Sequence, residues 1–275
     1  MHAFAPDGTK AWSCAIPDDP ARREQKGNLL GVTVVRLGWV NGADKAPWLM
    51  VGTQFRWVYG LDWSTGEIQH ETMHYFYGVE DAVFADLDGD GVDEGALALE
   101  YFYPSVWDDG AESRGGSAGG PGFTAVGLQE REGDSPLIVY GTKQNVVRTY
   151  AYADGTFTEQ WVSDVGGQVT DLCSGSFHDG VGAEIVVGTT GFHVSSLDPD
   201  GELRFRAVIG DRVVAVVPAP RDGYLVIAEH GLVVTLDTEG AESGRWRFPA
   251  AVTGGVVLSE GVRLVLADGT VVRPS

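Results

Sequence analysis

The stretch Trp48-Leu-Met-Val-Gly-Thr53 is an apolar run that ends in a small residue, and its pattern returns along the whole chain. A short apolar run bounded by turn residues predicts a buried strand. The strands of this kind carry their small residue at Gly52, Ala98, Gly141, Gly188, Ala228 and Ala267. Successive positions are 46, 43, 47, 40 and 39 residues apart, so the sequence predicts an internal structural repeat.

Each repeat has room for four short strands. A further strand and a turn follow the first, as in Val58-Tyr-Gly-Leu-Asp-Trp-Ser-Thr-Gly66. A last strand such as Glu202-Leu-Arg-Phe-Arg206 then completes the unit. Four strands within about 40–45 residues are typical of a β-propeller blade. We therefore predict an all-β fold, a six-bladed β-propeller of four-stranded antiparallel blades, as a single domain over residues 1–275.

The two ends of the chain bear on how this ring closes. The segment Met1-His-Ala-Phe-Ala-Pro-Asp-Gly8 has the pattern of a third blade strand, as in Ser196-Leu-Asp-Pro-Asp-Gly201. We expect the amino-terminal strands to join the carboxyl-terminal blade and close the ring. The segment Thr270-Val-Val-Arg-Pro-Ser275 has the same pattern, so one third strand is surplus. The start has no signal-peptide pattern, and a module of a longer protein is one interpretation of a chain that begins within a blade.

The segment Asp86-Leu-Asp-Gly-Asp-Gly-Val-Asp-Glu94 joins two of the predicted strands. Calcium takes six to eight oxygen ligands, and acids at positions 1, 3 and 5 of a tight turn can point at one centre. An EF-hand would require Glu at position 12, but that residue is Leu97, inside an apolar strand. We predict a calcium loop that closes a β-hairpin and stabilises the fold. Its expected ligands are Asp86, Asp88, Asp90, the Val92 carbonyl and Glu94.

These residues resemble two known groups of propeller repeats. The loop Asp86–Glu94 is similar to the calcium loop of FG-GAP repeats, which occur in integrin-type propellers and many bacterial surface proteins. The run over residues 51–66 resembles quinoprotein-like (PQQ-type) blades. The resemblance covers nearly the whole chain and implies a secreted or cell-surface protein. A full set of acidic ligands occurs in one repeat, since the aligned positions in the fourth repeat are Ser176, His178, Gly180 and Glu184. We therefore predict one calcium site.

Composition excludes several classes of partner. The chain has 39 acidic against 19 basic residues and a formal net charge of -20. Nucleic acids bind through Lys and Arg, so this charge opposes them. It also disfavours anionic lipid surfaces, and no run of 18 apolar residues predicts insertion into a membrane. The expected partner is therefore a glycan or a protein.

Aromatic and polar residues gather in loops that we expect on one face. In a propeller, the loops between second and third strands lie at the same end as the loops between blades, and the calcium loop lies at the opposite end. Aromatic rings next to hydrogen-bonding groups suit sugar rings. We predict a non-catalytic binding module, with a carbohydrate as the favoured ligand and a protein as the alternative. The predicted ligand-binding residues are Arg56, Trp57, Tyr75, Tyr77, Tyr101 and Tyr103.

Two enzymatic alternatives remain open at this stage. A polysaccharide lyase acting on an acidic glycan would need a base, for which His74 and His193 are candidates, and Arg56 or Lys143 to neutralise a uronate. A quinone-dependent dehydrogenase is the second alternative, although its blade motif lacks the expected Trp near Gln69. The sequence contains no nucleophile elbow and no phosphate loop, and we predict no catalytic residues. The Gly-rich segment Gly110–Gly122 is interpreted as a connection between blades.

Overall fold

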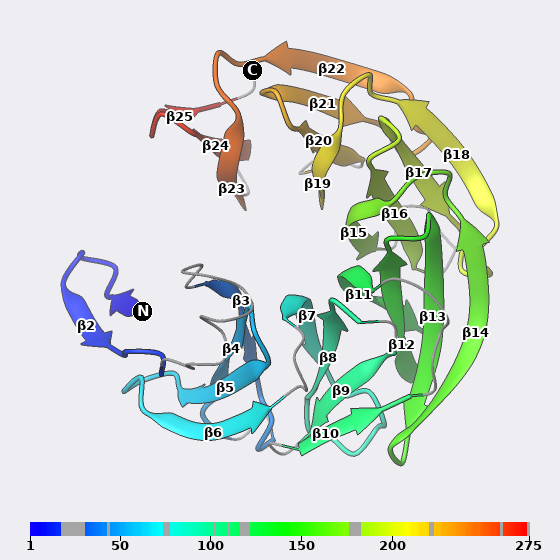
Figure 1. Cartoon of the computed structure of the whole chain (residues 1–275). Coiled ribbons are helices and arrows are strands. Elements are labelled where there is room, and N and C mark those ends of the chain that lie inside the picture. The colour runs from blue at the N-terminus through cyan, green and yellow to red at the C-terminus, as the bar shows by residue number, and fades with distance from the viewer. Residues whose placement is uncertain are drawn as a thin grey trace. The chain divides into compact units, whose positions relative to one another are not determined.

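The structure of the chain is a computed structural model, and it describes residues 1–17, 31–42, 45–73, 78–101, 103–108, 111–115, 122–175, 183–219, 223–258 and 261–273. In these ranges the regular structure consists of strands β1 to β25 (Figure 1). Among the described residues, no helix has the length and apolar character that crossing a bilayer requires. The chain divides into two compact units, Met1–Phe123 with Tyr152–Phe157, and Thr124–Ala151 with Thr158–Ser275.

The first unit contains a two-stranded sheet and two four-stranded sheets, each with its strands in chain order. The amino-terminal hairpin consists of β1 (His2–Phe4) and β2 (Lys10–Ser13). The first sheet consists of β3 (Val32–Gly38), β4 (Trp48–Thr53), β5 (Trp57–Asp62) and β6 (Ile68–Met73). The second sheet consists of β7 (Val79–Ala85), β8 (Glu94–Leu99), β9 (Ser105–Asp108) and β10 (Ala111–Arg114).

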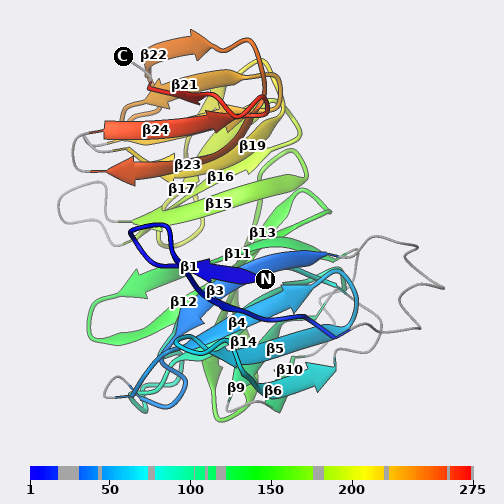
Figure 2. The same ribbon diagram turned by 90° about the vertical axis from the view of Figure 1, so that its left-hand side faces the viewer.

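The third to sixth sheets continue this order along the chain. The third sheet consists of β11 (Phe123–Arg131), β12 (Asp134–Thr142), β13 (Val146–Ala153) and β14 (Thr156–Asp164). The fourth consists of β15 (Val169–Gly175), β16 (Glu184–Thr189), β17 (His193–Leu197) and β18 (Leu203–Val208). The fifth consists of β19 (Val213–Pro218), β20 (Tyr224–Ala228), β21 (Leu232–Leu236) and β22 (Glu242–Arg247). The sixth consists of β23 (Val252–Leu258), β24 (Gly261–Leu266) and β25 (Val271–Val272), with β23 and β24 side by side in Figure 2.

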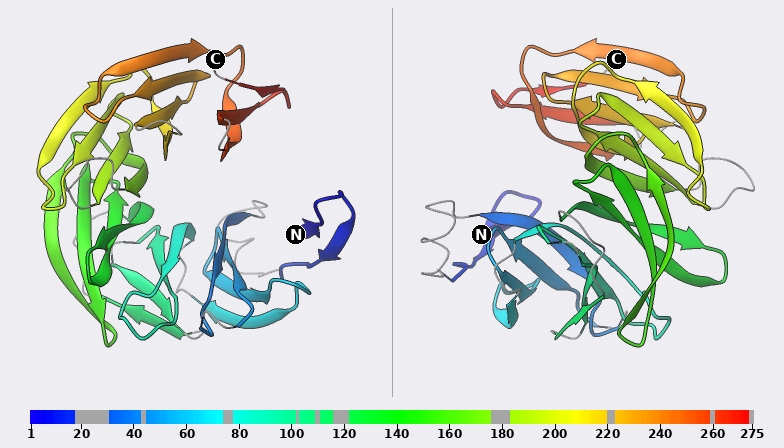
Figure 3. Two further views of the ribbon diagram at one scale, coloured as in Figure 1. Left: turned by 180° about the vertical axis from the view of Figure 1, so that it is seen from behind. Right: turned by 45° about the vertical axis from the view of Figure 1, so that its right-hand side comes forward.

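The small residues of the repeat lie where neighbouring sheets approach each other closely. Gly52, Gly141 and Gly188 each lie in the second strand of their sheet. A Cβ atom at any of them would collide with a valine on the first strand of the next sheet, namely Val79, Val169 and Val213 in turn. Aliphatic residues fill the rest of the interface between the fourth and fifth sheets, where Val186, Val213, Val226 and Leu232 form a core. Figure 3 shows the ribbons of these two sheets, green to orange, as neighbours.

The amino-terminal hairpin packs against one face of the first sheet. Met1, Cys14 and Ile16 contact the buried residues Val51, Tyr59 and Leu61, and the hairpin lies in front of this sheet in Figure 2. The described residues therefore form seven sheets, not six, because β1 and β2 make a two-stranded sheet of their own. Thr270–Ser275 does supply a third strand, β25. Closure of the ring by the amino-terminal strands stays a prediction.

One interpretation of a loop was wrong. Within the Gly-rich segment Gly110–Gly122, residues 111–114 form β10, the fourth strand of the second sheet, in place of a connection. Strand β10 pairs with β9 from Ala111 opposite Asp108 to Arg114 opposite Ser105. The backbone hydrogen bonds of an antiparallel pair are available to any residue, so a segment with little strand propensity can still complete a sheet.

Candidate functional site

The loop from Asp86 to Glu94 closes the hairpin of β7 and β8, as predicted, with Ala85 opposite Glu94. Its side chains accept hydrogen bonds from its own backbone. Asp86 accepts from the N–H groups of Gly89 at 2.7 Å and Gly91 at 3.0 Å. Gly89 and Gly91 both have φ of 87°, a conformation that glycine adopts without strain. The backbone therefore folds around the space into which the carboxylates point.

Three carboxylates meet in this loop. Asp86, Asp88 and Glu94 each offer an oxygen, and these oxygens lie within 4.8 Å of one another. Asp90 is not part of this group, and its Oδ1 accepts a hydrogen bond from the Val92 N–H at 2.8 Å. The structure thus brings together three of the four predicted carboxylate ligands. The roles of Asp90 and the Val92 carbonyl as ligands stay predictions.

Glu94 is the buried member of the group, with 1% of its surface exposed. Burial raises the pKa of Glu94 to about 8, although the Leu87 N–H donates to it at 2.8 Å, and the charges of Asp88, Asp108 and Asp90 raise it further. Burial of a carboxylate is unfavourable unless a cation compensates for its lost hydration. No Arg, Lys or His of the described chain forms an ion pair with Glu94.

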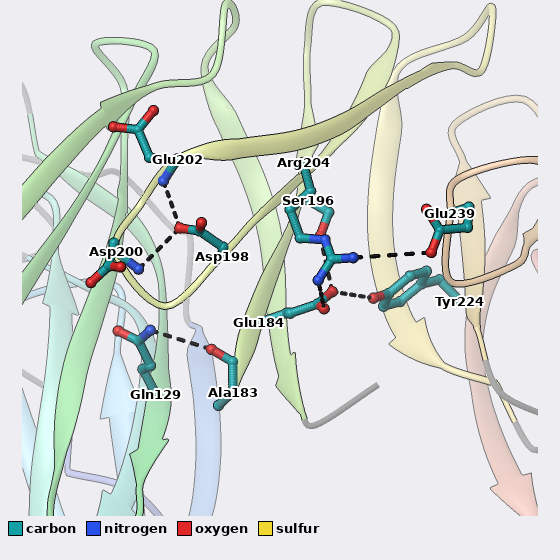
Figure 4. A network of polar contacts seen from close by, with 10 residues as sticks. All are labelled: Gln129, Ala183, Glu184, Ser196, Asp198, Asp200, Glu202, Arg204, Tyr224 and Glu239. Carbon is teal, nitrogen blue, oxygen red and sulfur yellow. Dashed lines mark hydrogen bonds and ion pairs between the residues drawn. The ribbon is translucent and has the colours of Figure 1, made fainter. Parts of the chain in front are cut away.

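Glu184 occupies the same position in the fourth sheet, as the first residue of the second strand, and it is buried completely. There the compensating cation is Arg204, whose guanidinium lies 2.7 Å from Glu184 Oε1 (Figure 4). Ser196 and Tyr224 donate hydrogen bonds to Glu184 Oε2, each at 3.3 Å. The two sheets therefore hold equivalent buried glutamates, one with an arginine and one among further carboxylates.

The donor set around Glu94 fits a hard divalent cation. Carboxylate oxygens are the ligands that calcium prefers, and a cation would compensate both for the burial of Glu94 and for its repulsion by neighbouring acids. The sequence alignment identified Glu184 as the equivalent of Glu94 but missed Arg204. The signal was present in Glu202-Leu-Arg-Phe-Arg206, where arginines alternate along a strand.

The predicted ligand face begins at the turn between β4 and β5. Thr53 Oγ1 donates to the carbonyl oxygen of Trp57 at 2.8 Å and closes the turn, and Arg56 has φ of 51°. The residue directly before the third strand also has positive φ in three other sheets, where it is Asn145, Phe192 or Gly231. Glycine and asparagine tolerate this conformation, whereas for arginine and phenylalanine it is strained.

The loops that carry Arg56 and Tyr101 lie at the same end of the first and second sheets. Gly78 joins them: it accepts a hydrogen bond from the Glu100 N–H at 3.1 Å, and its own N–H donates to Glu100 Oε2 at 3.2 Å. A Cβ atom at Gly78 would collide with the backbone of Gln54. These contacts bring both loops to the end opposite the Asp86–Glu94 loop, as predicted.

The rings of this face already have partners within the protein. The guanidinium of Arg56 lies 5.3 Å from the ring centre of Phe55 and 5.9 Å from that of Trp57. Tyr101 and Tyr103 make an edge contact, with ring centres 5.0 Å apart. Tyr103 also packs on the core of the first two sheets, and Arg114 lies 5.2 Å from its ring centre. Tyr103 thus has a packing role, and the predicted residues Tyr75 and Tyr77 lie outside the described residues.

The described histidines show no arrangement for general base catalysis with a nucleophile. His193, a candidate base, is buried, and its ring nitrogens lie 2.9 Å and 2.6 Å from the carbonyl oxygens of Gly191 and Val165. In the described part of the chain, no hydrogen bond joins a histidine to the side chain of a serine, threonine or cysteine. His193 therefore holds a turn in place, and the other candidate, His74, lies outside the described residues.

Of the comparisons with known proteins, the one with solved structures bears on the fold. No family model matches the chain, and no curated protein matches its sequence. Among solved structures, the chain is similar to BBS1N, crystallised in complex with ARL6DN, with a TM-score of 0.70, 13% identity and coverage of 87% of this chain and 78% of that chain. It is also similar to the WD40 β-propeller domain of Doa1, with a TM-score of 0.65, 13% identity and coverage of 96% and 80%. The fold is a β-propeller. Membership of the FG-GAP or quinoprotein-like group stays a prediction.

Proposed function

We propose that the chain is a non-catalytic binding module on a calcium-stabilised, six-bladed β-propeller, and that its ligand is a protein. Propellers support many unrelated activities, so the proposal depends on the sites and not on the fold. The observation that carries it is the conformation of Arg56. Strained backbone costs about 1–3 kcal/mol and collects where a side chain serves a ligand, and the equivalent residue Gly231 avoids it.

The state of the rings favours a protein over a glycan. A sugar stacks on the open face of an aromatic ring, but Trp57 and Tyr103 each have a guanidinium of the same chain nearby. Arginine and tyrosine are both enriched among the residues that contribute most to binding at protein interfaces. BBS1N, one of the structures of similar fold, was crystallised with a protein partner. A carbohydrate, the favoured ligand on sequence grounds, becomes the alternative.

Calcium has a structural part in this proposal. Asp86, Asp88 and Glu94 would hold the ion, with Asp90 and the Val92 carbonyl as further ligands. The bound ion supplies the positive charge that Arg204 supplies to Glu184 in the fourth sheet. The loop lies at the opposite end from Arg56, so calcium stabilises the blade without contacting the ligand. A secreted or cell-surface location would suit such a site and follows from the FG-GAP resemblance alone.

The class of ligand can be tested directly. The intact chain, in millimolar calcium, is screened against a random-peptide display library and against a glycan array. We expect reproducible enrichment of peptides and no binding to glycans. Binding to glycans alone would overturn the assignment of a protein ligand. Polyuronates incubated with the chain should stay intact, and release of unsaturated products would promote the lyase alternative.

A further inference from the structure

The fourth and fifth sheets carry a second surface with exposed aromatic and basic side chains. Its first element is Phe192, in the turn between β16 and β17. Thr189 Oγ1 donates to the His193 carbonyl at 3.1 Å, so this turn has the form of the one at Arg56. Phe192 has φ of 64°, and its side chain is 53% exposed. The strained backbone thus presents an aromatic ring to solvent and leaves most of the ring outside the core.

The second element is a histidine and an arginine that are both held by one carboxylate. His230 Nδ1 lies 2.9 Å from Asp211 Oδ1, and Arg247 Nη1 lies 3.8 Å from Asp211 Oδ2. Arg247 Nη1 also donates to the His230 carbonyl at 3.2 Å. Asp211 is largely buried, whereas His230 is 71% and Arg247 57% exposed. Because Nδ1 faces Asp211, the other ring nitrogen, Nε2, is left for a ligand.

The backbone connects these two elements. The N–H groups of Ile209 and Gly210 donate to the carbonyl oxygen of Phe192, at 2.8 Å and 3.2 Å. Asp211 follows directly and accepts a further hydrogen bond from the Arg212 N–H at 2.8 Å. The segment 209–211 is therefore fixed at one end by the turn of Phe192 and at the other by His230.

We propose that Phe192, His230 and Arg247 form a docking surface for a segment of a protein partner that presents a carboxylate next to an apolar side chain. The ring would take the apolar side chain, and the Arg247 guanidinium with the His230 Nε2–H would take the carboxylate through charge-assisted hydrogen bonds. Aromatic residues, phenylalanine included, and arginine are enriched at the centres of protein interfaces. The surface involves other residues than the turn at Arg56, and the proposal does not depend on the function proposed for that turn.

Protonation of His230 should strengthen the binding of the partner's carboxylate. The hydrogen bond to Asp211 and its charge raise the pKa of His230 from the ordinary value. The charged groups that act on the ring are Asp211 on the connecting segment, Glu229 on the neighbouring turn, and Arg247 at the end of β22. Arg212 lies 3.6 Å from Glu229, so these two largely offset each other. Loss of the proton at higher pH would remove one of two cations that face the carboxylate.

The test uses synthetic hexapeptides that contain Phe-Glu or Leu-Glu, with Phe-Gln and Leu-Gln peptides as matched probes, measured by fluorescence polarisation. We expect the Glu peptides to bind more tightly than the Gln peptides. Phe192→Gly and Arg247→Gln should each lower the affinity for the Glu peptides about tenfold, which corresponds to a loss of roughly 1.4 kcal/mol. Raising the pH from about 6 to about 9, a range over which histidine loses its proton, should also lower the affinity for the Glu peptides.

Two controls separate effects on folding from effects on binding. Phe192→Gly suits the positive φ, so its melting temperature should equal or exceed that of the wild type. Asn145→Gly places glycine at the equivalent position of the third sheet, where asparagine already tolerates the positive φ, and should leave binding unchanged. Equal binding of Glu and Gln peptides, or full binding by Phe192→Gly, would overturn the proposal.

Discussion

The indole Nε1 of Trp12 donates a hydrogen bond to the carbonyl oxygen of Trp63 at 3.0 Å. Trp161, on the outer strand of the third sheet, donates in the same way to Pro199 of the fourth sheet at 3.0 Å. Each indole also packs on a glycine of positive φ in that turn, Gly66 or Gly201. Strand β2 is therefore placed on the first sheet as an outer strand of a preceding sheet would be, and we propose that it is the outer strand of the sixth.

A first prediction concerns this closure. Trp12→Ala should lower stability by about 1–3 kcal/mol, less than for a fully buried Trp because Trp12 is half-buried. If β2 closes the ring, the amides of β25 should also exchange faster with deuterium. Phe4→Ala, on the same hairpin but largely exposed, should change neither quantity. Unchanged exchange in β25 after Trp12→Ala would show that the hairpin does not close the ring.

Removal of calcium should destabilise the chain. At a calcium concentration 100-fold above Kd, binding to the folded state contributes about 2.7 kcal/mol, or roughly 5–10 °C in melting temperature. Asp88→Ala should abolish this response in differential scanning calorimetry, whereas Asp200→Ala, an exposed acid in another turn, should keep it. Identical melting of the wild type in chelator and in millimolar calcium would rule the site out.

The pH dependence of stability should reveal Glu94. Its pKa is about 8 in the folded chain against an ordinary value of 4.5, so between these values the folded state holds a proton that the unfolded state has lost. Without calcium, its contribution to stability is therefore present below about pH 4.5 and falls as the pH rises toward 8. Calcium favours the carboxylate and should remove this fall. Chemical denaturation of Glu94→Gln should show neither the fall nor the calcium response; if the slope persists in this variant, another group causes it.

The arginine in the fourth sheet should be essential to stability. Arg204→Met leaves the Glu184 carboxylate buried without its cation, which costs about 3–5 kcal/mol for buried pairs. Adding Glu184→Gln should recover much of this loss in urea unfolding. Arg245→Met breaks the exposed pair with Glu242 and should cost less than about 1 kcal/mol. Equal costs for the two arginine variants would contradict the comparison of Glu184 with Glu94.

The sequence predicted the repeat well because close packing restricts its anchor positions. Gly52, Gly141 and Gly188 lie against valines of the next sheet, so only a small residue fits there. The repeat can therefore be recognised from the regular spacing of these small residues. The strand β10 was missed because backbone hydrogen bonds hold it, and its residues Ala111 to Arg114 show no strand pattern. The hairpin at Asp86 was predicted correctly because acids and glycines alternate only in a tight loop.

The sites were harder to predict than the fold. The aromatic face was inferred from composition, and composition does not reveal that Tyr103 packs on the core. The pair of Glu184 and Arg204 joins residues 20 positions apart, and no local pattern marks such a pair. The strain at Arg56 and Phe192 is invisible until the turns that contain Thr53 and Thr189 are aligned by structure.

The affinity of selected peptides for Arg56→Gly tests the central proposal most directly. Peptides enriched on the wild type are measured by calorimetry against Arg56→Gly and, as a control on the second surface, Phe192→Gly. Because glycine suits φ of 51°, the fold should melt at the same temperature or higher. The proposed binding face predicts about a tenfold or greater loss of affinity in Arg56→Gly, the effect of removing an interface anchor. If Arg56→Gly keeps full affinity, whether or not Phe192→Gly loses affinity, the proposed binding face at Arg56 is contradicted.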